Sequence, residues 1–102
     1  MQVKFTDKAI SHLESIIDSY LEFCGERSAV KFGKMVDDKL ESILRFPESG
    51  FPEPLLAGRN KLFRATIIKR YYKMIYYVDD DTIWVAAFWN MRMHPDKLVR
   101  MV

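Results

Sequence analysis

The feature that most constrains this chain is a change of hydrophobic period about halfway along it. Before residue 47, apolar residues recur at the spacing of three to four that marks one face of a helix. After residue 61 they gather into short runs rich in Ile, Val, Tyr, Phe and Trp, which favour strands. Because 102 residues are too few for two separate hydrophobic cores, both halves should fold together as one domain, residues 1–102.

The first half predicts two helices packed as an antiparallel hairpin. The first can be capped by Thr6 or Asp7 and stopped by Gly25. The second runs from about Glu26 to Arg45 and ends before Pro47, which cannot continue a helix. The connection is only a residue or two, so the helices should lie side by side. The expected buried stripes are Ala9, Leu13, Ile16, Ile17, Tyr20, Leu21 and Cys24 in the first helix and Ala29, Phe32, Val36, Leu40, Ile43 and Leu44 in the second.

Some residues of this hairpin invite a more specific interpretation. Gly33 costs about 1 kcal/mol of helix propensity relative to Ala, which a close approach between the helices would justify. His12 lies on the polar face and is interpreted as a surface residue. Tyr20, Phe23 and Phe46 lie near the edges of the apolar faces, where they either complete the core or meet a helix of a partner.

The second half predicts an antiparallel sheet. Its strand-like segments are Leu62–Ile68, Tyr71–Val78 and Thr82–Trp89. Lys69-Arg70 and Asp79-Asp80-Asp81 join them and are short enough for hairpins, so the three should form a meander. Residues 2–5 alternate polar and apolar and can add a fourth strand at an edge, while residues 47–61, rich in Pro and Gly, form a loop. The predicted fold is therefore α+β, with a helical hairpin on one face of a mainly antiparallel sheet of three to four strands and the other face free for function.

Composition and motifs exclude several classes of protein. Apolar residues make up 49% of the chain, which excludes a disordered protein. Cys24 is the single cysteine, so no intramolecular disulfide is possible. No apolar run reaches membrane-spanning length and no leader-like segment opens the chain, so a cytoplasmic protein without a membrane partner is expected. There is no Gly-rich phosphate loop, no Gly-x-Ser-x-Gly and no cluster of metal ligands, so neither a cofactor nor a metal is expected.

Positive charge gathers in the predicted sheet although the net charge is only +2. No acidic residue occurs between Pro54 and Val78. The cations of that stretch are Arg59, Lys61, Arg64, Lys69, Arg70 and Lys73. This asymmetry predicts a local positive field.

Strand alternation suggests how these side chains are distributed between the two faces. If Phe63, Ala65, Ile67, Met74 and Tyr76 face the helices, Arg64 and Lys73 both project from the open face. Trp84, Phe88 and Asn90 would point the same way, with Arg92 just beyond the last strand. Cations that hold phosphates beside rings that stack on bases are what a single-stranded nucleic acid needs. The RNA-binding set predicted on this basis is Arg59, Lys61, Lys69, Arg70, Trp84 and Phe88. A solvated strand face, or a dimer or partner interface over the two aromatic residues, explains the same pattern.

Two further residues suggest acid–base chemistry. His94 follows the last strand, and Glu53 is held between Pro52 and Pro54, whose rings stiffen its backbone. A histidine with a carboxylate across a site can complete an acid–base pair at neutral pH. An ordinary solvated loop residue is the alternative for each.

Several motifs of this chain occur together, in this order and spacing, in one known superfamily. They are Phe5 and Ala9 at the first helix, Pro47 after the second, Gly50-Phe-Pro-Glu-Pro-Leu55, Arg64, Tyr72-Lys-Met-Ile-Tyr-Tyr-Val78, the acidic turn after it, and Ile83-Trp-Val-Ala-Ala-Phe88. From Val3 to about Pro95 the chain resembles the RelE/ParE superfamily of type II toxin–antitoxin toxins. The resemblance implies the same α+β fold and a cognate antitoxin that lays an extended or helical segment on the toxin.

Two activities are known in this superfamily. Members that resemble RelE and YoeB are ribosome-dependent endoribonucleases that cut mRNA, whereas members that resemble ParE inhibit DNA gyrase without cleaving anything. The first expectation for this chain is a metal-independent endoribonuclease acting on mRNA at the ribosome. The alternatives are a ParE-like gyrase inhibitor and an inactive relic retained only as a partner of the antitoxin. A homodimer and a hetero-oligomer with the antitoxin are both compatible with the resemblance.

The nuclease interpretation assigns roles residue by residue. In RelE-like nucleases, basic residues on the middle strands and at the end of the last strand activate the ribose 2′-OH and stabilise the phosphate; Arg64, Lys73 and Arg92 match these positions. Thr66 stands where a second basic residue of the first strand is expected, and the C-terminal tyrosine has no counterpart.

The YoeB-like branch supplies the acid and the base. There the Pro-Glu-Pro-Leu stretch carries the proposed general base, which Glu53 matches. That branch ends in His-Tyr, whereas this chain has His94 and then continues to Val102. The predicted catalytic residues are thus Glu53, Arg64, Lys73, Arg92 and His94, for a reaction in which the 2′-OH attacks the adjacent phosphorus and the 5′-oxygen leaves.

Overall fold

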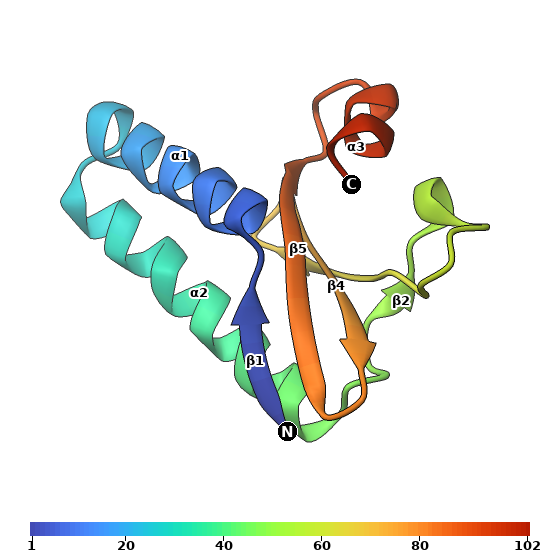
Figure 1. Ribbon diagram of the computed structural model, residues 1–102. Helices are drawn as coiled ribbons and strands as arrows, with labels where there is room; N and C mark the ends of the chain where they lie inside the picture. The colour runs from blue at the N-terminus through green and yellow to red at the C-terminus, as the bar shows by residue number, and fades with distance from the viewer.

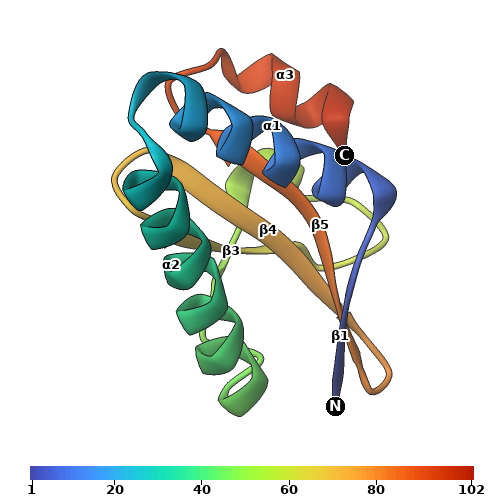
Figure 2. The same ribbon diagram turned by 90° about the vertical axis from the view of Figure 1, so that its left-hand side faces the viewer.

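The computed structural model describes residues 1–102 as two helices and a small third one around a single sheet (Figure 1). In chain order the elements are β1 (Gln2–Phe5), α1 (Asp7–Phe23), α2 (Glu26–Arg45), β2 (Phe51–Pro52), the 3-10 turn η1 (Pro54–Leu56), β3 (Arg64–Ile68), β4 (Tyr72–Asp79), β5 (Thr82–Asn90) and α3 (Pro95–Met101). Helices α1 and α2 form the predicted hairpin and cover one face of the sheet (Figure 2). None of the helices has the length and apolar character that crossing a membrane requires.

The start of α1 is fixed by the cap that the sequence predicts. The Thr6 hydroxyl accepts a hydrogen bond from the Ala9 N–H at 3.1 Å and donates one to the Ala86 carbonyl of β5 at 3.2 Å. Thr6 therefore both satisfies a free N–H of the helix and ties the helix to the sheet. The predicted ends of both helices are confirmed to within a residue or two.

The predicted reason for Gly33 is wrong. A Cβ built at this position would have nothing within 4 Å, so the glycine does not permit a close approach of the helices. It lines a shallow groove of about 510 Å³ between α1 and α2, together with Leu13, Ile17 and Val30. The helix therefore carries the propensity cost of glycine with no packing gain.

The sheet has five strands in the order β1-β5-β4-β3-β2. Strand β1 adds at the edge as predicted and runs parallel to β5, while the other pairs are antiparallel. The fifth strand, β2, lies in the predicted loop: Phe51 pairs with Ala65 and Pro52 with Arg64. Two residues are too few to show alternation in the sequence, which is why this strand was not predicted.

A bulge in β5 decides which side chains share a face. Ile75 pairs with Ala87 but its neighbour Tyr76 pairs with Val85, so Ala86 is an extra residue in β5. Alternation therefore shifts by one position. Val85 and Phe88, three residues apart, both face the hairpin.

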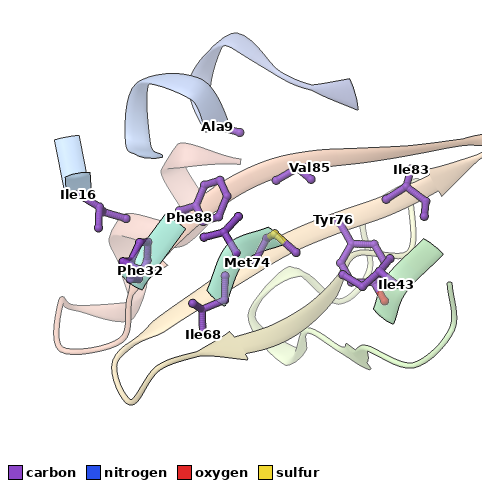
Figure 3. Packing of buried hydrophobic residues seen from close by; sticks show 11 residues of the cluster. Ala9, Ile16, Phe32, Ile43, Ile68, Met74, Tyr76, Ile83, Val85 and Phe88 are labelled. Atoms are coloured by element: carbon purple, nitrogen blue, oxygen red, sulfur yellow. The ribbon is translucent and has the colours of Figure 1, made fainter. Parts of the chain in front are cut away.

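The sheet separates two hydrophobic clusters. The larger lies between the hairpin and the sheet and includes Phe32, Ile43, Met74, Tyr76 and Phe88 (Figure 3). The smaller lies on the opposite face and consists of Leu56, Phe63, Ala65, Ile75, Ala86, Ala87, Trp89 and Leu98. The prediction of a free second face is therefore wrong, because α3 is a full two-turn helix that lays the fully buried Leu98 on that face.

Candidate functional site

Glu53 and Lys73 are the two predicted site residues that the fold brings together. Glu53 follows β2 and Lys73 lies in β4, and the Lys73 Nζ donates to both carboxylate oxygens of Glu53, at 2.5 and 3.2 Å. The side chain of Glu53 is 0% exposed and that of Lys73 14%. The structure thus holds one buried ion pair, beneath the second face of the sheet.

Two aromatic rings lie near the Lys73 side of this ion pair. The Lys73 Nζ lies 5.4 Å from the centroid of the Phe51 ring and 5.8 Å from that of Trp89, its partner across β4 and β5. The indole Nε1 of Trp89 is buried and has no hydrogen-bond partner. A cation held over ring faces and a carboxylate with both oxygens bonded form a closed arrangement.

Arg64 lies on the other face of the sheet, so the prediction that it shares a face with Lys73 is wrong. Residues opposite each other in an antiparallel pair share a face, and Arg64 opposes Tyr76 whereas Lys73 opposes Ile67. The Arg64 guanidinium donates to the carbonyls of Glu48 at 3.2 Å and Gly50 at 2.8 Å. It therefore holds the turn that follows α2.

Around Arg64 the structure has a cleft of about 580 Å³. Its walls come from the end of α2, the following turn and the outer ends of β3 and β4, and include Arg45, Phe46, Leu62 and Val78. On this side Tyr76 fixes the turn: its hydroxyl donates to the Pro47 carbonyl at 2.8 Å and accepts from the Gly50 N–H at 2.9 Å.

Arg92 lies at the end of the sheet where β5 stops. Its guanidinium carbon is 4.2 Å from the centroid of the Tyr71 ring, and its Nε donates to the Asn90 Oδ1 at 3.4 Å. The β3–β4 turn, residues 69–71, lies at the same end, and the Lys69 Nζ is 4.8 Å from the centroid of the Tyr20 ring. Cations from two separate segments thus lie at this end of the sheet.

His94 has a structural partner rather than a catalytic one. It caps α3: its Nδ1 accepts from the Asp96 N–H at 3.2 Å and lies 3.6 Å from the Asp96 carboxylate. The side chain is 71% exposed. No contact joins His94 to the buried pair of Glu53 and Lys73.

The remaining predicted RNA-binding residues are scattered. Arg59 donates to the Val99 carbonyl of α3 at 2.8 Å, and Lys61 pairs loosely with Asp79, at 3.9 Å, at the other end of the sheet. The Lys4 Nζ lies over the Trp84 ring, 5.7 Å from its centroid. Phe88 is buried in the core, so the prediction that Trp84 and Phe88 point the same way is wrong; the bulge at Ala86 turns them to opposite faces.

His12 has a role that the sequence analysis missed. Its Nδ1 accepts the Phe88 N–H at 3.3 Å, next to the bulge, so the ring helps to satisfy a backbone group of β5. Burial, aided by the charge of Lys8, lowers the pKa of His12 below its ordinary value of 6.5. A signal was present: His12 lies three residues after Ala9 and four before Ile16, at the border of the buried stripe.

Two solved structures share this fold of a helical hairpin on a mixed sheet. The structure titled "Chromosomal ParDE TA system from P. aeruginosa" has a chain that aligns with a TM-score of 0.70 at 20% identity, over 88% of this chain and 95% of the other. "The structure of YoeB dimer from Staphylococcus aureus" aligns with a TM-score of 0.60 at 21% identity, over 85% and 92%. At these identities the likeness is one of fold.

The sequence itself assigns the family. The family described as the ParE toxin of the type II toxin–antitoxin system parDE matches residues 3–95. The chain therefore belongs to the ParE toxin family. No curated protein sequence matches it significantly. As a member of this family, the chain is a toxin of a type II toxin–antitoxin system, and family membership implies a cognate antitoxin as its partner.

Proposed function

We infer that this toxin arrests growth without cleaving RNA, by binding DNA gyrase in the cytoplasm and blocking it, until its antitoxin sequesters it. The observation that carries this inference is the burial of Glu53. The only carboxylate in the position of a general base has no exposed surface and is neutralised by Lys73. Membership in the ParE family supports the same conclusion, since members that resemble ParE act on gyrase.

A general base must come within about 2.6–3.2 Å of the proton that it removes. Both oxygens of Glu53 already accept from Lys73, and the rings of Phe51 and Trp89 lie against the cation. A ribose 2′-OH would have to displace the lysine and part the rings. Separating Glu53 from Lys73 would leave each of the two buried charges without a partner of opposite charge, which is strongly unfavourable.

The predicted catalytic cations are also not arranged to bind one phosphate together. Donors that stabilise a developing oxyanion must all lie about 2.7–3.1 Å from one oxygen. Arg64 and Lys73 lie on opposite faces of the sheet, and Arg64 is bonded to backbone carbonyls. Arg92 stacks on Tyr71 and His94 caps α3. The five predicted catalytic residues form three separate structural contacts and one buried pair.

A nuclease remains the second candidate, because one observation favours it. Glu53 and Lys73, which the resemblance to YoeB and RelE matches to a base and a phosphate-binding cation, do touch each other. If the ribosome pulled the 47–61 loop away, these two groups would be released together. An inactive relic is the third candidate, and it predicts no growth arrest at all.

One experiment separates the three. The toxin is induced without antitoxin while mRNA 5′ ends, translation and plasmid supercoiling are followed, and the purified full chain is added to gyrase supercoiling reactions. The double variant Glu53→Leu/Lys73→Met replaces the ion pair by apolar side chains of similar length. We expect the wild type and the double variant to inhibit supercoiling alike and to leave mRNA intact.

Two results would contradict the proposal. New mRNA ends that appear within minutes and vanish in the double variant would establish the nuclease. Growth arrest with unchanged supercoiling and intact mRNA would exclude both activities, and an absence of arrest would identify a relic.

A further inference from the structure

One end of the sheet in this toxin is basic. There Lys69 and Arg70 of the β3–β4 turn lie at the same end as Arg92, which follows the last residue of β5. The three consecutive aspartates of the β4–β5 turn, residues 79–81, lie at the opposite end of β4. Eight residues of strand separate the ends by about 25 Å, since a strand rises about 3.3 Å per residue. This distance exceeds the screening length of about 8 Å at physiological salt.

We call the cations of the basic end the basic tip: Lys69, Arg70 and Arg92. All three are exposed, and none takes part in an ion pair. The turn of three residues, 69–71, joins β3 to β4, and Lys69 in it has a φ of +55°. Free cations gathered at one end of a sheet create a surface for an anionic partner.

Aromatic rings order two of the three cations. Arg92 stacks at 4.2 Å on the Tyr71 ring, and Lys69 lies 4.8 Å from the centre of the Tyr20 ring. The Arg92 backbone N–H also donates to the Asn90 Oδ1 at 2.9 Å, which fixes the residue after β5. A guanidinium stacked through its face keeps N–H groups at its edge available for a phosphate, and in Arg92 these are the two terminal Nη groups, because Nε donates to Asn90. Order before binding reduces the entropy that binding costs.

We propose that the basic tip binds the sugar–phosphate backbone of duplex DNA. Single-stranded nucleic acid requires open ring faces on which bases stack, and the cations cover the faces that Tyr71 and Tyr20 offer here. Phe88 is buried and Trp84 lies on another part of the sheet beneath Lys4. Cations without a stacking platform fit phosphates rather than bases.

The proposal deepens the proposed function and rests on it. Gyrase acts on duplex DNA, so a toxin on gyrase could touch the enzyme with one surface and the bound DNA with its tip.

The test is equilibrium binding of the full-length toxin to a fluorescent duplex of mixed sequence, by anisotropy, from 25 to about 200 mM salt. The tip variant is Lys69→Asn/Arg70→Gln/Arg92→Gln, in which asparagine tolerates the positive φ of position 69. The matched control removes three cations from helix α2: Lys31→Gln/Lys34→Gln/Lys39→Gln. Far-UV circular dichroism verifies that both variants are folded.

Three phosphate contacts predict a slope of about −2.7 in a plot of log K against log salt, at about −0.9 per contact. The tip variant should lose most of this slope and about tenfold or more in affinity at the lowest salt, while the control keeps both. Equal losses in the tip variant and the control would overturn the proposal. So would tighter tip-dependent binding of a single-stranded RNA of equal length, or equal displacement of the duplex by polyglutamate.

Supercoiling reactions distinguish a failure of this proposal from a failure of the proposed function. If the wild type inhibits gyrase but the tip variant inhibits equally well and binds DNA equally well, the tip proposal fails and the gyrase proposal stands. If the tip binds duplex DNA as expected but gyrase is unaffected by the wild type, the binding site stands and the gyrase proposal fails.

Discussion

The buried ion pair gives the sharpest prediction about this fold. Replacing Glu53 by Leu leaves the ammonium of Lys73 uncompensated among aromatic rings, and replacing Lys73 by Met leaves a carboxylate with no exposed surface and no partner. Removing one member of a buried pair costs about 3–5 kcal/mol. For a domain of 102 residues, each kcal/mol lowers Tm by about 4 °C or more, so each single variant should melt at least about 12 °C lower.

The double variant Glu53→Leu/Lys73→Met should recover most of this loss. It leaves no buried charge, and apolar side chains of similar length suit the rings of Phe51 and Trp89. Buried pairs replaced in this way often leave stability unchanged or raised. The coupling free energy between the two sites should therefore be about 3 kcal/mol or more.

Urea unfolding measures all four corners of this double-mutant cycle, provided that the m-value stays constant. The exposed pair of Lys61 and Asp79, 3.9 Å apart with side chains 41% and 61% exposed, is the control. Its coupling should stay below about 1 kcal/mol. If Glu53 and Lys73 coupled no more strongly than this surface pair, the description of Glu53 as a buried structural acid would be refuted, and with it the argument against a nuclease.

Three further predictions test the packing. Gly33→Ala should raise the free energy of unfolding by up to about 1 kcal/mol, since a methyl group there meets no other atom; urea unfolding measures this. Gly50→Ala should do the opposite, by about 1–3 kcal/mol, because its Cβ would collide with the Tyr76 hydroxyl and lie 2.9 Å from the carbonyl of a neighbouring strand; a stable Gly50→Ala protein would contradict the tight turn. The pKa of His12 is lowered in the folded protein, so the unfolded chain binds a proton first as pH falls. Stability should therefore be complete above pH about 6.5 and decline below it until the folded-state pKa is passed, and His12→Gln should flatten this part of the profile.

Local signals in the sequence were sufficient to predict the helical hairpin and the meander of β3, β4 and β5. Thr6, Gly25 and Pro47 mark helix ends through side-chain or backbone chemistry that acts within a few residues. The apolar period then identifies most of the residues of α1 and α2 that pack on the sheet, but Leu21, Cys24 and Leu44, which it placed in the buried stripes, are exposed. The pairing of β4 with β5 follows from their short acidic connection, Asp80 and Asp81.

The faces of the strands could not be predicted in the same way. In β3, Ala65 and Ile67 alternate with Arg64, Thr66 and Ile68, and both sets contain apolar residues because both faces of the sheet carry a core. The distribution of apolar side chains in β3 therefore does not show which of its two faces packs against the helical hairpin. The bulge at Ala86 leaves no trace in composition, yet it separates Trp84 from Phe88. These features depend on contacts between residues far apart in the chain, which no local pattern reports.

The C-terminal helix α3 explains why Glu53 and Lys73, which match residues of a nuclease site, are buried beside a hydrophobic cluster in this structure. Leu98 of α3 is fully buried in the cluster that contains Trp89 and Leu56, and Leu56 belongs to η1, which begins directly after Glu53. Arg59 ties the loop before β3 to α3 through the Val99 carbonyl. The helix thus presses the loop onto the sheet and keeps the carboxylate of Glu53 against Lys73. A chain that ended at the last strand would lack this clamp, and the same acid and cation would lie at a more open surface. If the proposed function holds, the helix, rather than any change at Glu53 or Lys73, is what keeps these two residues from forming a nuclease site.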